Sequence, residues 1–200
     1  MKYKLMNKTK PDAQEKEREE EGFVARLLKT RTIIIADEID KKIAQRVISQ
    51  FLLLEQEDPK KPIKLFINSP GGDADAGFAI FDLARFIKPE VKTICAGITA
   101  SAAVIILLGA TKKNRYSLPN ARILIHQPST GVTGSAADIQ IEASEILKFR
   151  DKINRLIAKE TGQDVKKVES DTRRNYWMGG EEALKYGLIS KIIKNRDELG

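Results

Sequence analysis

The sequence predicts an α/β protein in which short, mostly parallel strands alternate with helices. Apolar runs rich in isoleucine and valine are separated by segments whose apolar residues recur every three or four positions. These two patterns are typical of buried strands and of amphipathic helices. Proline or glycine stands at many of the junctions, where the chain must turn. Their alternation favours a parallel sheet covered by helices.

Each predicted strand is a short run in which β-branched or other apolar side chains dominate. The first run reads TIIIA and the second reads IKLFIN. A sharp turn follows the second run, because Pro70 fixes φ while Gly71 and Gly72 permit positive φ. The predicted strands are residues 32–36, 63–68, 91–98 and 122–126.

Helices are predicted where apolar side chains fall on one face. The first such face is formed by Ile43, Val47, Phe51 and Leu54. Pro59 ends this helix because proline cannot continue the hydrogen-bond ladder. A second helical pattern covers residues 77–88 and stops at Pro89. The segment 102–109 is apolar throughout, so a helix there would be buried on all sides.

Residues 135–161 carry a long apolar seam surrounded by charged residues. The seam positions, spaced by four and three, are Ile139, Ala143, Ile146, Arg150, Ile153 and Ile157. This coiled-coil-like pattern predicts a long helix. The helix could lie on its own core, or it could project and pack on another subunit, and the periodicity does not distinguish these arrangements.

Length and composition fit one domain with an appended arm. The chain has 200 residues, 42% of them hydrophobic and 32% charged, which permits a sizeable core. Residues 12–21 contain six acids and two bases, as in a solvated helix or an arm. We therefore expect an N-terminal arm over residues 1–22, a domain over 23–196 and a short tail over 197–200.

Several classes of protein are disfavoured. The longest apolar stretch, residues 102–110, is shorter than the ~20 residues that span a bilayer, and the N-terminus has no apolar signal region. The single cysteine, Cys95, cannot form an intrachain disulfide, so a cytoplasmic setting is expected. One histidine and one cysteine cannot supply a usual zinc site. The net charge of +7 is spread along the chain, so no nucleic-acid partner is expected.

Three positions are candidates for chemistry. Ser101 follows a predicted strand and precedes the apolar helix, where the helix dipole would stabilise an oxyanion; alternatively it is an ordinary helix cap. His126 ends the strand RILIH and is the only imidazole, so it is either a general base or a structural histidine. The turn Asn68–Gly72 could present backbone N–H groups to an anion, or it is only a tight turn.

These residues lie within a wider resemblance. The matching segments are INSPGG at 67–72, IKPEVKTICAGITAS at 87–101, LPNARILIHQP at 118–128, EILKFRDKIN at 145–154, TGQ at 161–163 and EALKYGLI at 182–189. In type, order and spacing, from about residue 27 to residue 193, they resemble the proteolytic subunit of the Clp protease.

The resemblance implies a crotonase-like α/β superhelix in which Ser101 is the nucleophile and His126 the base. Gly72 and Ala102 would supply the N–H groups of the oxyanion hole. The helix over residues 135–161 would be the family's handle, which joins two heptameric rings into a closed chamber. The N-terminal arm would line the axial entrance, and an AAA+ Clp ATPase would feed in unfolded proteins. ATP would be consumed by that partner, so no cofactor is expected on this chain.

The sequence departs from the family at the third catalytic position. The family pattern D-T-x-R-D reads DTRRN over residues 171–175, so Asn175 stands where an aspartate belongs. Asparagine can accept a hydrogen bond from the base, but it carries no charge to stabilise an imidazolium. The same exchange in an unrelated serine protease lowers kcat about 10⁴-fold. Asp171 is the nearest carboxylate that could substitute.

Two further departures concern partners. Arg173 and Arg174 replace an acidic residue and an arginine that bridge the rings in many family members, so that ion pair cannot form between like copies. Lys64 stands where an aromatic residue commonly lines the pocket for the ATPase loop, although Phe66 is retained. Docking of the ATPase is therefore expected to be weaker or directed to another surface.

The expected function is that of an ATP-dependent serine endopeptidase subunit that cleaves unfolded proteins inside a double-ring chamber. The first alternative is a weakly active or structural ring subunit that supports an active paralogue, which Asn175 favours. The second is an acyl-CoA enzyme of the wider crotonase fold, which would not explain the pairing of Ser101 with His126. A mixed assembly with a second proteolytic subunit is consistent with the expected function and with the first alternative.

Overall fold

The computed structural model describes residues 22–199. The arm expected over residues 1–22 lies almost entirely outside this range. The strands are β1 (Thr32–Ile35), β2 (Ile63–Ser69), β3 (Val91–Ala100), β4 (Arg115–Ser117), β5 (Arg122–Ile125), β6 (Tyr176–Met178) and β7 (Lys191–Ile192). A first helix covers residues 22–29, and the helices that follow are α2 (Lys41–Glu57), α3 (Ala74–Phe86), α4 (Ala102–Leu107), α5 (Ala136–Thr161), α6 (Val165–Thr172) and α7 (Gly180–Tyr186).

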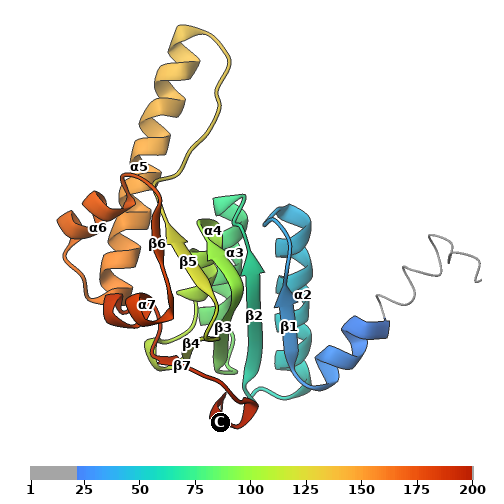
Figure 1. Ribbon diagram of the computed structural model, residues 1–200. Coiled ribbons are helices and arrows are strands. Elements are labelled where there is room, and N and C mark those ends of the chain that lie inside the picture. The colour runs from blue at the N-terminus through green and yellow to red at the C-terminus, as the bar shows by residue number, and fades with distance from the viewer. Residues whose placement is uncertain (1–21, 200) are drawn as a thin grey trace, which may run out of the picture.

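The strands form one sheet with β3 at its branch point. Strands β1, β2, β3, β4 and β7 follow one another in parallel. Beyond its pairing with β4, β3 pairs in parallel with β5 over Ile98–Ala100, and β5 in turn pairs antiparallel with β6. Figure 1 shows the resulting twisted sheet with α2, α3 and α4 beside it. The carboxyl ends of β2, β3 and β5 consequently meet at one end of the sheet.

The strands and helices expected from the sequence are all present, with ends displaced by a few residues. The expected α/β class with mostly parallel strands is confirmed. Strands β4, β6 and β7 were not indicated, because each is only two or three residues long and carries no periodic pattern. The antiparallel β6 lies directly beside the functional site.

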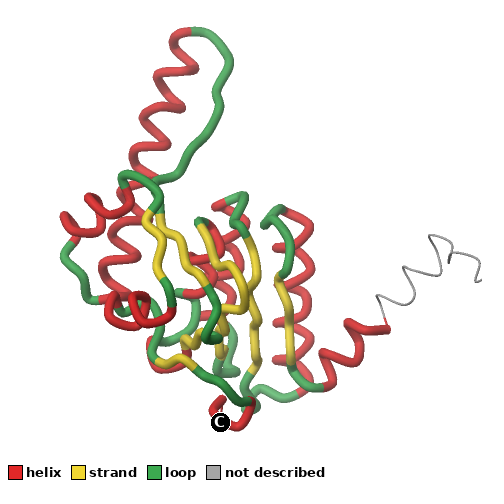
Figure 2. The backbone as a smooth tube through the Cα atoms, viewed as in Figure 1, coloured by secondary structure: helices red, strands yellow, loops and turns green. Residues whose placement is uncertain are grey.

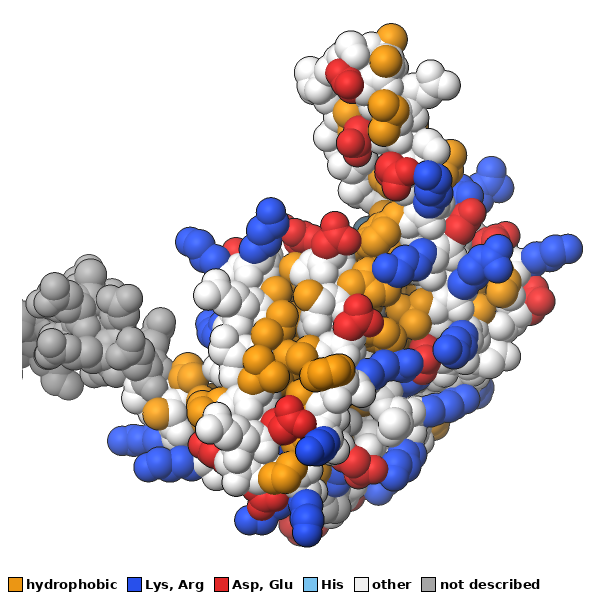
Figure 3. All heavy atoms as spheres, turned by 180° about the vertical axis from the view of Figure 1, so that it is seen from behind, with side chains coloured by type: hydrophobic (Ala, Val, Ile, Leu, Met, Phe, Trp, Pro, Cys, Tyr) orange, Lys and Arg blue, Asp and Glu red, His pale blue; other side chains and the backbone are white. Residues whose placement is uncertain are grey.

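Helix α4 is buried on every side, as its uniform apolar sequence indicated. Helices α2 and α3 bury one face each, with Asp40 and Asp73 as N-caps that accept from backbone N–H groups in the first turn. Some apolar side chains remain exposed, including Leu52 and Leu53 of α2 and Phe86 at the end of α3. Figure 3, the view from behind, shows apolar side chains gathered on the body below the projecting part of the chain.

Helix α5 has two unlike halves. It begins with a capping box between Ser135 and Asp138 and ends at Gly162 in the left-handed conformation. Its first half projects from the body beside the loop that leads into it (Figures 1 and 2), and Ile139 there is 45% exposed. In its second half Ile157 is only 3% exposed. The two arrangements left open by the periodicity therefore divide the helix: its second half covers its own core, and its first half projects from the body.

A buried ion cluster fixes the base of α5. Glu160 pairs with Arg85 at 2.7 Å and with Arg115, whose side chain is fully buried. Both arginines also donate to the carbonyl of Leu108, at the end of α4. Burial alone would raise the pKa of Glu160, but hydrogen bonds from Arg115 and Arg85 outweigh it and hold the pKa below its ordinary value. The cluster thus joins α3, α4, β4 and α5.

Candidate active site

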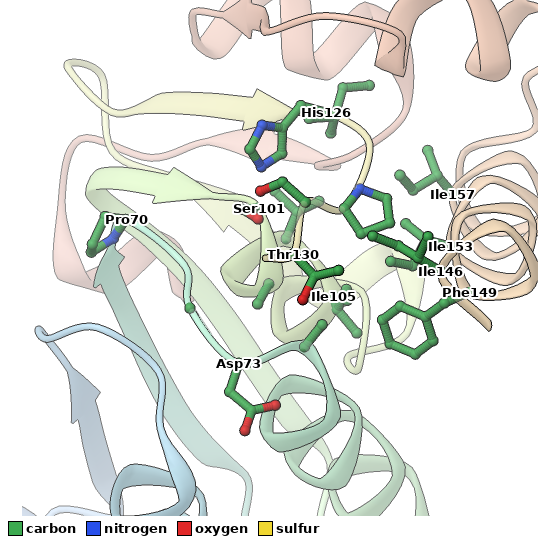
Figure 4. A pocket seen from close by; sticks show the side chains of 17 residues that line it. Pro70, Asp73, Ser101, Ile105, His126, Thr130, Ile146, Phe149, Ile153 and Ile157 are labelled. Atoms are coloured by element: carbon green, nitrogen blue, oxygen red, sulfur yellow. The ribbon is translucent and has the colours of Figure 1, made fainter. Parts of the chain in front are cut away.

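A cavity of about 410 Å³ opens where β2, β3 and β5 end. Ligand sites in open parallel sheets lie at such carboxyl ends. One edge of the cavity is formed by Gly72, Ser101, Ala102 and His126. The opposite wall is apolar and comes from α4 and α5; it includes Ile105, Ile146, Phe149, Ile153 and Ile157. Figure 4 shows these side chains converging on the cavity.

Ser101 occupies a strained turn between β3 and α4. Its φ of 56° and ψ of −122° are unusual for a residue with a side chain. Its backbone N–H donates to Leu124 of β5 at 3.0 Å, and its hydroxyl makes no helix-capping bond. The alternative that Ser101 only caps a helix is therefore not realised. Strain of this kind persists where the surrounding structure enforces it, which is common at functional sites.

The turn after β2 packs directly against Ser101. A Cβ atom on Gly71, whose φ is +102°, would lie 2.7 Å from the Cβ of Ser101. A Cβ atom on Gly72, whose φ is +139°, would lie 2.3 Å from the carbonyl oxygen of Ile39. Only glycine fits at both positions.

Two backbone N–H groups beside Ser101 are free to bind an anion. The N–H of Gly72 has no backbone partner among residues 22–199. Ala102 is the first residue of α4, so its N–H has no partner within the helix. Both residues line the cavity that contains Ser101. Unpaired donors at such a turn are suited to a developing negative charge.

His126 follows β5 and faces Ser101. Figure 4 shows the imidazole ring and the Ser101 side chain pointing toward one another at the mouth of the cavity. On the other side of the ring, Nδ1 lies 3.1 Å from Oδ1 of Asn175. The register of β5 with β6 explains this contact, because Ile125 pairs with Tyr176 and the next antiparallel positions are His126 and Asn175. With Oδ1 as acceptor, Nδ1 carries the proton and Nε2 keeps its lone pair.

Residues 15–196 match the family model described as Clp protease. The chain belongs to the Clp protease family. It is 50% identical over 195 residues to the ATP-dependent Clp protease proteolytic subunit 2 of Treponema denticola, with 98% of each chain covered. It is 48% identical over 180 residues to the protein of the same name from Treponema pallidum, with 90% of each covered.

A solved Clp protease structure has the same fold. It is an asparagine-to-aspartate variant of ClpP1 from Listeria monocytogenes, 46% identical, with a TM-score of 0.83 over 89% of this chain and 99% of that one. The resemblance inferred from the sequence is confirmed, and the α/β model is consistent with the crotonase-like fold that it implied. Family membership and the names of the relatives support a protease function.

Within this Clp protease fold, Asp171 does not contact His126. Its carboxylate accepts from Lys167 at 2.5 Å and from the hydroxyl of Tyr186 at 2.9 Å. Burial, and then the neighbouring Asp171 carboxylate, raise the pKa of Tyr186. Asp171 is thus engaged elsewhere, and Asn175 is the group that faces His126.

The apolar wall was not identified as part of the site by the sequence. Ile146, Ile153 and Ile157 were expected only to form the seam of a long helix, and that periodic pattern cannot show which cavity a helix lines. Phe149 lies beside this seam, with its ring centroid 5.5 Å from that of Phe78. Within the described part of the chain, no group of three or more His, Cys, Asp or Glu side chains is placed to hold a metal ion.

Proposed function

We propose that this chain is a serine endopeptidase subunit of the Clp type, with Ser101 as nucleophile and His126 as general base. Asn175 orients the base, and the N–H groups of Gly72 and Ala102 hold the oxyanion. The observation that carries the proposal is the meeting, in one cavity, of a strained serine and the chain's only imidazole. The far nitrogen of that imidazole contacts an amide oxygen.

The geometry suits acyl transfer. Nε2 of His126 accepts the hydroxyl proton as Oγ of Ser101 attacks the peptide carbonyl, and the carbonyl oxygen takes up negative charge between the two N–H groups. The imidazolium then gives its proton to the leaving amine, and the C–N bond breaks to leave an ester on Ser101. Water, deprotonated by His126, attacks that ester, and the proton returns to Oγ as the acid product leaves.

Asn175 makes this apparatus weaker than one with a carboxylate. Its Oδ1 fixes the tautomer of His126, but a neutral amide cannot balance the charge of the imidazolium. We therefore propose low activity for this subunit alone, and higher activity in a mixed assembly with a second proteolytic subunit.

The substrates are proposed to be unfolded proteins. The isoleucine and phenylalanine side chains of the cavity wall would hold an apolar side chain next to the cut bond. The projecting half of α5 and the exposed apolar side chains of α2 and α3 would be covered in an assembly. We propose that this assembly consists of two stacked heptameric rings, of one or two kinds of subunit, and that α5 joins the rings.

The partner that supplies unfolded chains is proposed to be an AAA+ Clp ATPase, in keeping with the names of the relatives, which are subunits of an ATP-dependent protease. It would consume the ATP, so no cofactor is proposed for this chain. A second cavity, of about 580 Å³, is lined in part by Ile34, Lys64, Phe66 and Leu199. Burial, then the charges of Arg196 and Lys92, lower the pKa of Lys64. A cation in this wall supports weaker docking of an apolar ATPase loop.

The proposed setting is the cytoplasm, without a nucleic-acid or membrane partner. Among the residues that the structure describes, no helix is both long and apolar enough to cross a bilayer. A structural ring subunit that supports an active paralogue remains the second candidate, and Asn175 is the observation that favours it. The relatives are proteolytic subunits, so no observation favours an acyl-CoA enzyme.

A fluorophosphonate probe and a fluorogenic peptide separate the two candidates. The wild-type chain is expected to be labelled at Ser101 and to turn over the peptide slowly, whereas Ser101→Ala should do neither. Asn175→Asp should raise kcat by about 10²-fold, because it restores the charge that balances the imidazolium.

Absence of labelling in both wild type and Asn175→Asp would establish the structural alternative. Fast turnover by both, with no gain from the aspartate, would disprove the proposal that Asn175 makes the catalytic apparatus weaker.

A further inference from the structure

Asn175 contacts the proposed base from an exposed segment directly before β6. Residues 173–175 are exposed and join the end of α6 to β6, whose residues Tyr176 and Trp177 pair with β5. The contact between Oδ1 of Asn175 and Nδ1 of His126 is 3.1 Å long, close to the limit of a good hydrogen bond. A small displacement of this segment would therefore break the contact.

In addition to the antiparallel pairing of β5 with β6, three residues hold this segment against the end of β5. The backbone N–H of Gln127, next to His126, donates to the carbonyl of Thr172 at 2.6 Å. The side-chain amide of Gln127 donates to the carbonyl of Arg173 at 3.1 Å. On the other side, the hydroxyl of Thr172 lies 2.9 Å from Oδ1 of Asn154, which belongs to α5. We call Asn154, Thr172 and Gln127 the relay clamp.

Both side chains at the centre of the relay clamp are buried. Asn154 and Thr172 are each 1% exposed. The hydroxyl of Thr172 also lies 2.8 Å from the carbonyl of Val168, one turn earlier in α6. Because Thr172 thereby fixes α6 to α5 and, through its carbonyl, to β5, its position sets the start of the segment that carries Asn175.

The buried position of Asn154 is unfavourable for the stability of the fold. Among the described residues, its Nδ2 is buried without a hydrogen-bond partner. If the amide were turned over, Nδ2 would donate to the Thr172 hydroxyl, but Oδ1 would then occupy the position without a partner. In either orientation one buried polar atom is unsatisfied, so an apolar side chain of similar size would favour stability. A role outside stability explains the asparagine.

We propose that Asn154 and Thr172, together with Gln127, are positioning residues that keep Asn175 in contact with His126. This inference rests on the proposed function, in which that contact sets the tautomer of the base. Because Asn175 is uncharged, it can assist the base only through the placement of its amide oxygen. Its dependence on the relay clamp is correspondingly strong, and the clamp ties the proposed base to the second half of α5.

Isosteric substitutions at Thr172 test the proposal. Thr172→Val removes the hydroxyl and keeps the shape, whereas Thr172→Ser keeps the hydroxyl. Thr161→Val is the matched control, because Thr161 is also buried and its hydroxyl bonds to the carbonyl four residues earlier, at 2.6 Å from Ile157. Asn154→Leu removes the unsatisfied amide. All variants are measured as full-length chains in the native assembly.

The decisive readout is the tautomer of His126, observed by NMR after selective histidine labelling. The chain has one histidine, so the signal needs no assignment. Thr172→Val and Asn154→Leu are expected to reduce the population protonated at Nδ1 and to lower kcat about fivefold, as for one neutral hydrogen bond. KM should stay unchanged and Thr172→Ser should behave as wild type. Asn154→Leu should also melt at or above the wild-type temperature.

A purely structural role gives a different pattern. Thr172→Val and Thr161→Val would then both lower the melting temperature, and the tautomer of His126 would stay as in wild type. That result overturns the proposal. The tautomer is measured without turnover, so a chain that lacks activity but shows the expected shift would disprove the proposed function alone.

Discussion

Ser101 stands between a strand and a helix that are both buried, whereas Asn175 stands in an exposed segment between α6 and β6. On the serine side, backbone conformation and close packing fix the proposed nucleophile. There Gly71 passes so close that no side chain fits, and Leu124 accepts the N–H of Ser101. On the asparagine side, a few polar side chains of the relay clamp hold Asn175 in position. The two halves of one site are thus held by different forces.

This difference has a consequence for the response to mutation. A tightly packed backbone has no alternative arrangement of similar energy, so a change on the serine side displaces the whole turn. On the asparagine side, the contact of Asn175 with His126 and the bond from the Gln127 amide to Arg173 are exposed, so they can be exchanged for bonds to water at small net cost. We expect large effects on the serine side and graded effects on the asparagine side.

The largest effect is expected for Gly71→Ala. The added Cβ atom would meet Ser101 and the carbonyl of Ala100 at 2.7 Å, and the φ of +102° disfavours any side chain. Displacement of the proposed nucleophile should slow labelling by a fluorophosphonate by about 10²-fold or more. Gly131→Ala is the control, because a Cβ atom there has no neighbour within 4 Å. If Gly71→Ala were labelled as fast as the wild type, the serine side would not be rigid.

The ion cluster at the base of α5 supports both sides of the site, so its loss is expected to lower stability. Glu160→Gln leaves the buried Arg115 without a counter-charge and should cost about 3 kcal/mol, seen as a lower melting temperature. Glu145→Gln, which breaks an exposed pair with Lys148, should have little effect.

The cluster also predicts a pH dependence. The pKa of Glu160 is lower in the folded chain than its ordinary value of 4.5, so its stabilisation is complete above that value. This stabilisation disappears as the pH falls through the lowered pKa. The melting temperature of the wild type should therefore fall more steeply in acid than that of Glu160→Gln. If the melting temperatures of the two proteins fell in parallel with pH, Glu160 would not be the cause of the loss of stability in acid.

A smaller effect is expected for Asn175→Ala. A neutral amide oxygen contributes orientation without charge, so its removal should lower kcat for a peptide by about tenfold, the size of one hydrogen bond. The wild type and the faster Asn175→Asp variant are the two reference rates above it. A loss as large as that of Gly71→Ala would contradict the difference drawn between the two sides.

The smallest effect is expected at Cys95, on the strand that leads to Ser101. The thiol is fully buried, and burial raises its pKa to about 12. Native protein should therefore not react with iodoacetamide, whereas unfolded protein should react readily. Reaction of the native chain at neutral pH would show that β3 opens locally and that the serine side is less tightly held.

Some elements could be predicted from the sequence because patterns among neighbouring residues determine them. The β-branched runs of β2 and β3 and the periodic faces of α2 and α5 gave both their type and their approximate ends. Strand β6 escaped notice, because three residues carry no period and its partner β5 lies far away in the sequence. Because β6 was not predicted, the local patterns did not indicate the contact between His126 and Asn175 either. Only the family resemblance had implied it.

The sequence by itself determined the alternation of strands and helices, the apolar helix after Ser101 and the fact that only one imidazole could act as a base. The tertiary structure decided the positive φ of Ser101, the free N–H groups beside it, the division of α5 into a packed and a projecting half, and the engagement of Asp171 with Tyr186. Local patterns record the preferences of neighbouring residues, which follow from side-chain shape and backbone hydrogen bonding. Strain, register and cavity walls arise from contacts between segments remote in the chain, and these exist only when the whole sheet has formed.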